Sequence, residues 1–385
     1  MKTLIPRNEP PRWRYRKREP EGVGLTAEPL MARGRGVLVE GSDATRMTVG
    51  GAPEEPRRSR ASSPTAAALR LPVRAPFHLE ATVRVLQRRP TNLIDTWDGD
   101  HYRRVVRLAD RFALLEVNNR GTIDAPDLGL SIRADAASAR DREAAVRTAR
   151  EILGLEQDPA AAQRYAQAEP ALRETARALR GMRPPRYPCL FEAFANVIPF
   201  QQVSLEAGMS VVAHLVRRFG EVIDSDGRTY HVFPQAEAIA EARTVSVKRS
   251  GMSLRKTQSL RAAAKAIASG ALTAESLSRL SSEEAIARLT ELGGIGPWSA
   301  ALILLRGLGR LDVFPQADTG AESSLAALLR LRSCASLPKV VERFGDFRGY
   351  LYFYGLASRL LAAGLIHPAG ELSAHRNDPI RAHSR

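Results

Sequence analysis

One stretch decides how this sequence folds: Leu292-Gly293-Gly294-Ile295-Gly296-Pro297-Trp298, which predicts a tight hairpin between two helices. A helix is expected to end near Leu292. Gly293, Gly294 and Gly296 permit positive φ in the turn, and Pro297 suits the first turn of the next helix. Such a turn leaves backbone amides free at a helix N-terminus, where they bind anions. The alternative is an ordinary connector between antiparallel helices.

A carboxylate follows the hairpin at Asp318, twenty residues after Trp298. It closes the run Asp312-Val313-Phe314-Pro315-Gln316-Ala317-Asp318, in which the proline cannot continue a helix, and an apolar-periodic segment begins directly afterwards. Asp318 is therefore expected near a helix N-cap, where the helix dipole keeps it ionised. Its role is either chemistry or capping alone. Asp312 is the competing carboxylate, and the spacing from Trp298 favours Asp318.

The residues around these two features predict a helical domain from Asp158 onward. Apolar residues recur at three- and four-residue spacing, as helices packed on a common core require. Ser281 followed by Glu283 and Glu284 marks a helix start, with acids near the positive end of the dipole. The predicted helices are 171–179, 190–219 with a candidate break at Pro199, 236–242, 253–269, 274–280, 282–292, 298–308, 320–331 and 347–363.

The residues before this domain predict a small sheet. Short β-branched runs broken by Gly, Asp and Asn are typical of strands joined by hairpins. They occupy 79–86, 92–97, 102–108 and 112–117, and a helix is expected over 138–155. The predicted fold class is α+β, with a small antiparallel-sheet domain and a mostly helical domain. The expected boundaries are 1–71 for a disordered basic tail, 72–150 for the α+β domain, 151–373 for the helical domain and 374–385 for a frayed tail.

Charge and cysteine content restrict the class of partner. The formal net charge of +15 favours an anionic partner. Residues 1–75 hold fifteen Lys or Arg against eight Asp or Glu, so roughly half of the basic excess lies outside the expected folded part. Two cysteines alone cannot ligate an iron–sulfur cluster or a structural zinc, and their sparse use fits a reducing cytoplasm. No apolar run predicts a membrane span or a secretory signal.

Two side chains near the motifs suit recognition of a nucleotide base. An indole face attracts cationic rings, and alkylated purines carry positive charge, so Trp298 is a candidate wall of a base pocket. The alternative is a core tryptophan. Gln201 and Gln202 lie within the helix predicted over 190–219, where an exposed amide could enter the stack left by an extruded nucleotide. The alternative is surface glutamines. No lysine lies between the hairpin and Asp318, so no Schiff-base nucleophile is evident there.

Together these residues resemble the helix-hairpin-helix DNA glycosylases with a Gly/Pro-rich loop and Asp, specifically the AlkA-type 3-methyladenine DNA glycosylase II. The resemblance covers about residues 72–370 and is most specific over 198–204, 231–234, 251–256, 292–298 and 312–318. It implies that Asp318 is the catalytic aspartate, that Trp298 is the aromatic of the base pocket and that Gln202 is the intercalating wedge. It also implies that Gly294 and Gly296 contact the DNA backbone. A lysine occupies the Trp298 position in bifunctional relatives, so a monofunctional enzyme is implied.

The resemblance further implies the activity, the ligands and the partners. The activity is hydrolysis of the N-glycosidic bond of alkylated purines, chiefly 3-methyladenine and 7-methylguanine. Backbone carbonyls of Thr290, Leu292 and Ile295 are expected to hold a structural monovalent cation, Na+ or K+, and no further cofactor is required. The expected partner is double-stranded DNA containing damaged bases. The protein is expected to be monomeric and cytoplasmic, without a membrane partner.

Departures from the family pattern keep two alternatives open. The run Phe344-Gly345-Asp346-Phe347-Arg348 replaces the family's Trp-x-Pro-Trp-Arg. Leu302 and Leu356 stand where AlkA-type enzymes can have pocket aromatics. A less aromatic pocket leaves open a weak or inactive protein that only binds lesions or DNA structure. It also leaves open a glycosylase for oxidised or deaminated bases.

Overall fold

The computed structural model describes residues 58–59, 65–108, 111–134, 138–225, 227–316, 318–331 and 337–371. The chain divides into two units, Met1–Pro53 and Glu54–Arg385, and every described residue belongs to the second. Most of the predicted N-terminal tail and all of the predicted C-terminal tail over 374–385 therefore lie outside the described residues. None of the helices in the described ranges is long and apolar enough to cross a membrane.

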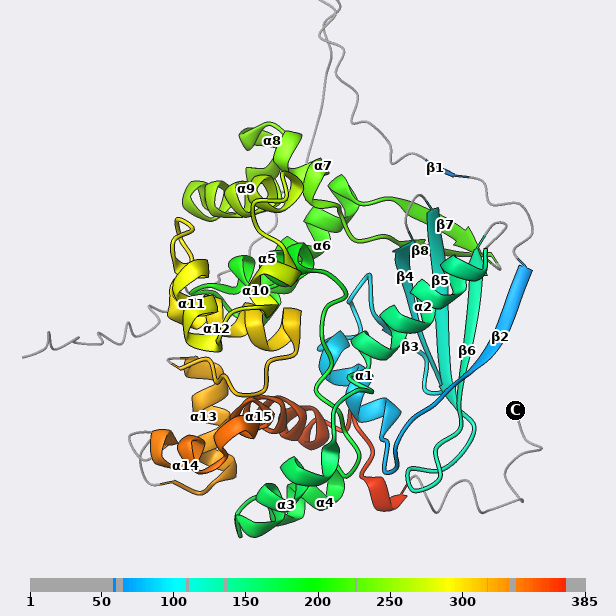
Figure 1. The fold of residues 1–385 in the computed structure, drawn as a ribbon, viewed down its shortest axis with the longest axis vertical. Coiled ribbons are helices and arrows are strands. Elements are labelled where there is room, and N and C mark those ends of the chain that lie inside the picture. The colour runs from blue at the N-terminus through cyan, green and yellow to red at the C-terminus, as the bar shows by residue number, and fades with distance from the viewer. Residues whose placement is uncertain are drawn as a thin grey trace, which may run out of the picture. The chain divides into compact units, whose positions relative to one another are not determined.

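An antiparallel sheet of five strands, in the order β2-β6-β5-β4-β3, forms the N-terminal part of this unit (Figure 1). β4 and β5 form a hairpin, as predicted, with Val105 opposite Leu114. β6 alternates buried and half-buried residues, the pattern of a strand with one covered face. The strands are β2 (Thr65–Leu71), β3 (Thr96–Trp97), β4 (His101–Leu108), β5 (Arg111–Asn119) and β6 (Leu128–Ala134).

Two predictions for this part are wrong. Residues 65–71, assigned to the tail, form β2 and pair with β6 along their whole length. Pairing with a neighbouring strand stabilises this alanine-rich stretch, whose own strand propensity is low. Residues 79–86, predicted as a strand, belong to helix α1 (Leu79–Gln87). Apolar residues alternate with polar ones from Leu79 to Val85, and this period of two imitates a strand, although Glu80, Arg84 and Gln87 also share one face of the helix.

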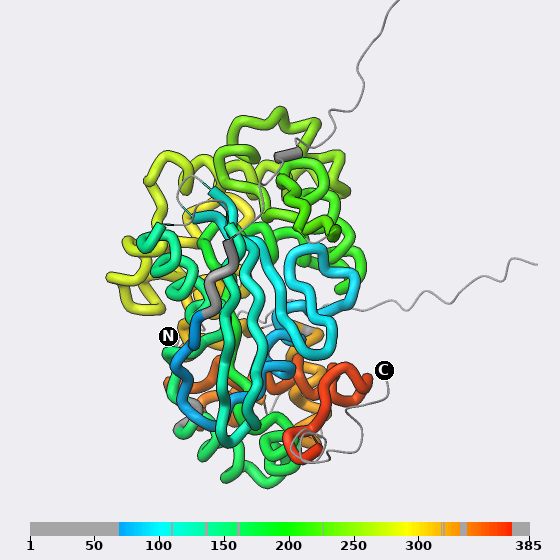
Figure 2. Tube along the Cα trace, turned by 90° about the vertical axis from the view of Figure 1, so that its right-hand side faces the viewer, coloured from blue at the N-terminus to red at the C-terminus, as the bar shows by residue number. Residues whose placement is uncertain are grey.

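Two helices connect the sheet to the rest of the unit. α2 (Ala139–Ile152) begins at a capping box of Ser138 and Asp141 and packs on β4, β5 and β6. α1 contacts both β3 and α15 (Arg348–Ala362), so it lies between the sheet and the helices. Figure 2, viewed from the sheet side, shows the strands in front and the helices behind them. One hydrophobic cluster includes residues of the sheet, of α1 and of α15.

The remaining described residues are mostly helical, and the predicted α+β class is confirmed. Ser281 and Glu284 form a capping box at the predicted helix start. The helices are α3 (Pro159–Ala168), α4 (Arg173–Ala178), α5 (Leu190–Ala195), η1 (Ile198–Phe200), α6 (Leu205–Phe219), α7 (Ala236–Glu241), α8 (Thr244–Lys248), α9 (Leu254–Ala268), α10 (Ala274–Ser278), α11 (Ser282–Thr290), α12 (Pro297–Ile303), η2 (Leu304–Leu308), α13 (Thr319–Leu328), α14 (Leu337–Arg343) and η4 (Gly345–Phe347).

The helix predicted over 190–219 is three elements rather than one. α5 ends before Pro199, which lies in the short helix η1, and Ser204 caps α6 through the amide of Ala207. A proline without an amide and a good N-cap residue explain the division. Strands β7 (Val222–Ser225) and β8 (Arg228–His231) were not predicted. β7 pairs with β8 and with β1 (Arg58–Ser59), so the three strands form a second small sheet in the order β1-β7-β8.

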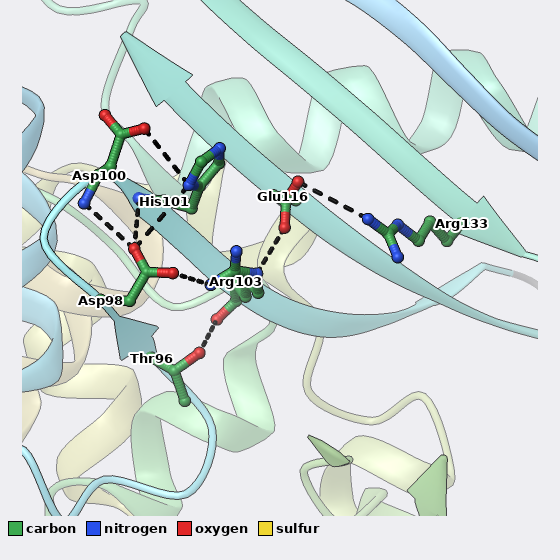
Figure 3. A network of polar contacts seen from close by, with 7 residues as sticks. All are labelled: Thr96, Asp98, Asp100, His101, Arg103, Glu116 and Arg133. Atoms are coloured by element: carbon green, nitrogen blue, oxygen red, sulfur yellow. Dashed lines mark hydrogen bonds and ion pairs between the residues drawn. The ribbon is translucent and has the colours of Figure 1, made fainter. Parts of the chain in front are cut away.

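Charged side chains on the five-stranded sheet pair across neighbouring strands (Figure 3). Arg103 on β4 bonds both Asp98, in the turn before it, and Glu116 on β5. A nitrogen of Arg133 on β6 lies 3.9 Å from Glu116. Such cross-strand pairs of opposite charge help to fix the register of a sheet.

A second, buried set of charges joins the sheet to α5. Arg104 donates to Asp95 at 2.8 Å and also to Glu192, and the hydroxyl of Tyr102 donates to Asp95 at 2.7 Å. All three charged side chains are almost fully buried. Because a buried charge is costly without partners, this cluster holds the sheet and the helical part in one arrangement.

Candidate active site

The hairpin lies between α11 and α12, as the sequence predicts. Its amide at Ile295 donates to the carbonyl of Leu292 at 3.0 Å, and Gly296 is the N-cap residue of α12. Pro297 is the first residue of that helix. Gly296 has no side chain to bond the first amides of α12, so the amides of this helix end remain available to an anion.

The three glycines of the hairpin were predicted to permit positive φ, and the structure uses that freedom at one of them. Only Gly294 has positive φ, at 86°. A Cβ at Gly294 would lie 2.0 Å from Oγ of Ser259 on α9. Both the positive φ and this close approach therefore require glycine at this position. Gly296 has φ −95° and ψ 177°, and a Cβ there would meet no atom within 4 Å.

A turn carrying Gln201 and Gln202 packs against the hairpin. Both residues lie between η1 and α6, so their predicted place within a helix is wrong. The amide nitrogen of Gln201 donates to the carbonyl of Gly294 and to Oγ of Ser299, both at 2.9 Å. Gln202 is exposed and has φ 55°, which non-glycine residues rarely adopt. Gln201 therefore fixes the turn against the hairpin, and Gln202 is left exposed at the cleft.

Asp318 caps α13 and also contacts Trp298. Its Oδ1 accepts the amide of Ala321 at 2.9 Å, and its Oδ2 accepts the indole Nε1–H of Trp298 at 3.1 Å. The predicted N-cap position is thus confirmed, and capping uses only one carboxylate oxygen. Trp298 is half-buried: it packs on the hydrophobic core and also lines a cleft. Asp312, the competing carboxylate, is exposed and is not among the residues that line this cleft.

A cleft of about 1060 Å³ brings these elements together. All five residues predicted to act in catalysis, in the base pocket or in DNA binding line it: Gln202, Gly294, Gly296, Trp298 and Asp318. Thr290, Leu292 and Ile295, proposed as carbonyl ligands of a cation, are not among its lining residues. Among the described residues, no group of three His, Cys, Asp or Glu side chains is placed to hold a metal ion.

The cleft is more aromatic than the sequence suggested. Leu302 and Leu356 do line it, but so do Phe200 and Tyr352. Tyr352 and Leu356 are four residues apart on α15, so they share a helical face. That spacing was the available signal for Tyr352, and it gives the cleft an aromatic ring one turn before the position where the family pattern suggested one.

Basic residues of the cleft were also missed, among them Lys256 and Arg88. Lys256 donates its amine to the carbonyl of Pro199 at 3.1 Å, and burial lowers its pKa. Arg88, at the end of α1, is buried with its guanidinium carbon 5.0 Å from the centre of the Phe200 ring. No pattern in the sequence pointed to Arg88, which lies just after the strand predicted over 79–86 and in the part assigned to the small sheet domain.

Comparisons with known proteins identify the family. Residues 68–188 match the model of the AlkA N-terminal domain, and residues 195–344 match that of the HhH-GPD superfamily base excision DNA repair proteins. A Bacillus subtilis protein named DNA-3-methyladenine glycosylase is 30% identical over 216 residues, which are 55% of this chain and 71% of that protein. The chain therefore belongs to the HhH-GPD superfamily, in its AlkA-type branch.

Two further relatives extend the similarity to both parts of the unit. A Mycobacterium tuberculosis protein named probable bifunctional transcriptional activator/DNA repair enzyme AlkA is 29% identical over 86% of this chain, which spans 65% of that protein's length. The solved structure of a 3-methyladenine DNA glycosylase from Archaeoglobus fulgidus has a TM-score of 0.63 and 27% identity, covering 77% of this chain and 99% of that one. The sheet and the helical part thus both belong to the shared architecture.

Proposed function

We propose that this protein is a monofunctional DNA glycosylase that hydrolyses the N-glycosidic bond of alkylated purines, chiefly 3-methyladenine and 7-methylguanine. The observation that carries the proposal is the bond between Trp298 and Asp318 at the wall of the cleft. It places a carboxylate beside an aromatic face in a space large enough for one base. Family membership supports the same activity, as do the names of the bacterial and archaeal relatives.

The geometry suits a sequence of binding, extrusion and hydrolysis. Amides of the hairpin bind a phosphate of double-stranded DNA, which positions the protein without reading sequence. The damaged nucleotide leaves the stack, and Gln202 on its exposed turn fills the gap. The extruded base stacks on Trp298, whose face attracts a positively charged ring. Each step uses a residue that the fold holds at the cleft.

Asp318 then stabilises the charge that develops on the sugar. An alkylated cationic base is a good leaving group, so the bond breaks with little help from a general acid. The sugar gains positive charge, and the ionised carboxylate of Asp318 stabilises it or orients the attacking water. Bonds from Ala321 and Trp298 fix both carboxylate oxygens before substrate arrives. In many enzymes such electrostatic preorganisation supplies most of the rate enhancement.

A glycosylase for deaminated or oxidised bases is the second candidate. Leu302 and Leu356 give part of the cleft an aliphatic wall, which does not attract a cationic ring. Phe200, Trp298 and Tyr352 still supply aromatic rings, so the alkylated purines remain the first choice. A protein that only binds lesions is less well supported, because Asp318 and Trp298 are both present and in contact.

One panel of duplexes tests these candidates. Free base is measured after incubation of the protein with DNA carrying 3-methyladenine, 7-methylguanine, hypoxanthine or 8-oxoguanine. Release of the methylated bases, with the abasic strand left uncut, is expected from a monofunctional enzyme. Release of only deaminated or oxidised bases would favour the second candidate. Tight binding to damaged duplex without any release would identify a binding protein.

We also propose that the protein acts as a monomer. A Na+ or K+ ion beneath the hairpin is proposed to bind the backbone carbonyls of Thr290, Leu292 and Ile295, and no other cofactor is proposed. The Leu292 carbonyl already accepts the Ile295 amide, and a carbonyl has a second lone pair for a cation. DNA affinity at constant ionic strength should fall when K+ and Na+ are replaced by choline. Unchanged affinity would exclude a cation that supports the hairpin.

A further inference from the structure

Arg88 occupies an unusual position in the cleft. It follows the last residue of α1, and its backbone has φ 61° and ψ −43°, a region that non-glycine residues seldom adopt. Its side chain is 7% exposed and lines the same cleft as Trp298 and Asp318. Strained backbone is kept in proteins mainly where the surrounding structure holds a residue for function. Arg88 therefore brings a positively charged side chain from the N-terminal part of the unit to the cleft lined by Trp298 and Asp318.

Arg88 is charged, and part of its hydrogen-bonding capacity is unused. Burial alone lowers its pKa, but nearby Tyr187, Tyr352, Asp318 and Asp95 outweigh burial and raise the pKa overall. Its Nε is fully buried and has no hydrogen-bond partner within the described part of the chain, so only the terminal N–H groups of the guanidinium can reach a base in the cleft. The guanidinium lies over the ring of Phe200, an arrangement that holds its plane without using its N–H groups.

A fixed cation changes which bases the cleft accepts. It repels a base that is itself positively charged, such as 3-methyladenine in DNA. It favours a neutral purine that presents a carbonyl oxygen or a ring nitrogen as acceptor, because guanidinium N–H groups are donors only. A bond between a charged donor and a buried acceptor discriminates strongly against a base without that acceptor.

We propose that Arg88 is a specificity-determining residue that donates to the acceptor edge of the extruded base and so raises release of neutral carbonyl-bearing purines such as hypoxanthine relative to release of cationic 3-methyladenine. This inference rests on the proposed glycosylase activity. It assigns the discrimination between neutral and cationic bases to one side chain. Asp318 and Trp298 serve both classes of base, whereas Arg88 separates them.

The same contact assists departure of a neutral base. In the hydrolysis the bond between C1′ and the purine nitrogen breaks, and its electron pair stays on the base. The oxygen of water bonds to C1′, and a proton of that water passes to a base that leaves as an anion, or to solvent when a cationic base leaves neutral. A neutral purine gains negative charge as the bond breaks, and the guanidinium of Arg88 stabilises that charge. A cationic purine becomes neutral instead and gains nothing from it.

Two substitutions test the assignment. Arg88→Met removes the charge and the donors but keeps a long side chain, and Arg88→Lys keeps the charge but loses the planar fork. Single-turnover rates are measured for release of hypoxanthine and of 3-methyladenine from otherwise identical duplexes. The ratio of the two rates does not depend on the fraction of folded enzyme, so partial unfolding of a variant does not obscure it.

The expected result is a fall of at least about tenfold in the hypoxanthine to 3-methyladenine ratio for Arg88→Met, with a smaller fall for Arg88→Lys. Arg89→Met is the matched control. It removes the same charge one residue away, from a half-exposed side chain that pairs with Glu206 at 2.9 Å, and its ratio should equal that of the wild type.

Several results would overturn the assignment. Equal loss of both rates in the Arg88 variants would show that Arg88 supports the fold or Asp318 instead of reading the base. An unchanged ratio, or a wild type that releases 3-methyladenine but no hypoxanthine, would refute the inference and leave the proposed function intact. Release of neither base by the wild type would refute the proposed function and the inference with it.

Discussion

The outer charges of the sheet and the charges of the cleft are held in different ways. On the sheet, Arg103 lies between Asp98 and Glu116, so these charges satisfy one another (Figure 3). In the cleft, Asp318 is held by a neutral indole and a backbone amide, and Arg88 is held over an aromatic ring. Charges fixed by neutral partners keep their field for a substrate, whereas paired charges largely cancel each other's field.

The buried cluster of Arg104, Asp95 and Glu192 shows the limit of this rule. Burial raises the pKa of Glu192 to about 7. Arg104 bonds Glu192 and lowers this pKa, but Arg104 also bonds Asp95, whose negative charge raises it. A strongly shifted carboxyl is often taken as a sign of an active site, but ion-pair networks shift pKa values as well. Glu192 does not line the large cleft, so here the shift reports how the two parts of the unit are joined.

The largest expected effect comes from Asp318→Asn, which tests whether the cleft charge does chemistry. Asparagine caps helices about as well as aspartate, so α13 should begin where it does now. Loss of the negative charge should lower the rate of base release about a hundredfold or more, with DNA affinity retained. Single-turnover release and binding to the same duplex measure the two quantities.

Asp312→Asn is the matched control for this experiment. Asp312 is exposed and belongs to the same stretch of chain, so the change removes an equal charge outside the cleft. Its rate should remain that of the wild type. Equal rates for Asp318→Asn and the wild type would end the assignment of Asp318 as the catalytic carboxylate.

The next effect distinguishes Gly294 from Gly296, two of the three glycines of the hairpin. Gly294→Ala places a Cβ against Ser259 at a backbone with positive φ, and should cost ~2 kcal/mol or more of stability together with DNA affinity. Gly296→Ala meets open space at an ordinary φ and should leave both nearly unchanged. Thermal unfolding and duplex binding of both variants check this. Equal effects would mean that the amides act without the close packing on α9.

Local features of the site were predictable from the sequence, and long-range ones were not. The hairpin, its proline and the N-cap at Asp318 each depend on a few neighbouring residues, and the structure has them as predicted. The bond from Gln201 to Gly294 joins residues 93 positions apart, so no local pattern contains it. Arg88 reaches the cleft only because α1 packs between the sheet and α15.

Errors in the fold have the same origin. In α1, apolar and polar residues alternate from Leu79 to Val85, so the period of a strand competes with the helical period in the same segment, and packing against β3 and α15 decides for the helix. β2 has little strand propensity of its own, and its partner strand supplies the backbone bonds. In both cases tertiary contacts decide the local structure, and these contacts are what a single sequence conceals.

A smaller effect tests the buried cluster through its pH dependence. The carboxyl of Glu192 has its pKa raised from 4.5 to about 7 in the folded protein. Below pH 4.5 the carboxyl is protonated in both the folded and the unfolded state, so its ionisation does not yet lower the free energy of unfolding. As pH rises through that window toward 7, the unfolded state ionises first and stability is lost. Glu192→Gln cannot ionise and should not show this loss.

Unfolding temperatures of wild type and Glu192→Gln between pH 4 and 8 isolate this group, since all other groups cancel in the difference. The wild type should lose roughly 2–4 °C relative to the variant as pH rises. The opposite slope would show that the ion pair with Arg104 outweighs the cost of burial. In that case the charge cluster stabilises the junction of the two parts through its charges.

The smallest expected effect concerns charges that belong to neither region. Residues 1–53 carry ten Lys or Arg against six Asp or Glu, and they precede the unit that holds the sheet and the cleft. A chain beginning at Glu54 should keep its single-turnover rate on damaged duplex. Its DNA affinity should depend less steeply on salt, by roughly 0.9 in logarithmic slope for each phosphate that the protein no longer neutralises. If the shortened chain lost catalysis at low salt while remaining folded, the N-terminal residues would contribute to the cleft itself. In that case the N-terminal residues would supply a further set of charges that act in the cleft, in addition to those of Asp318 and Arg88.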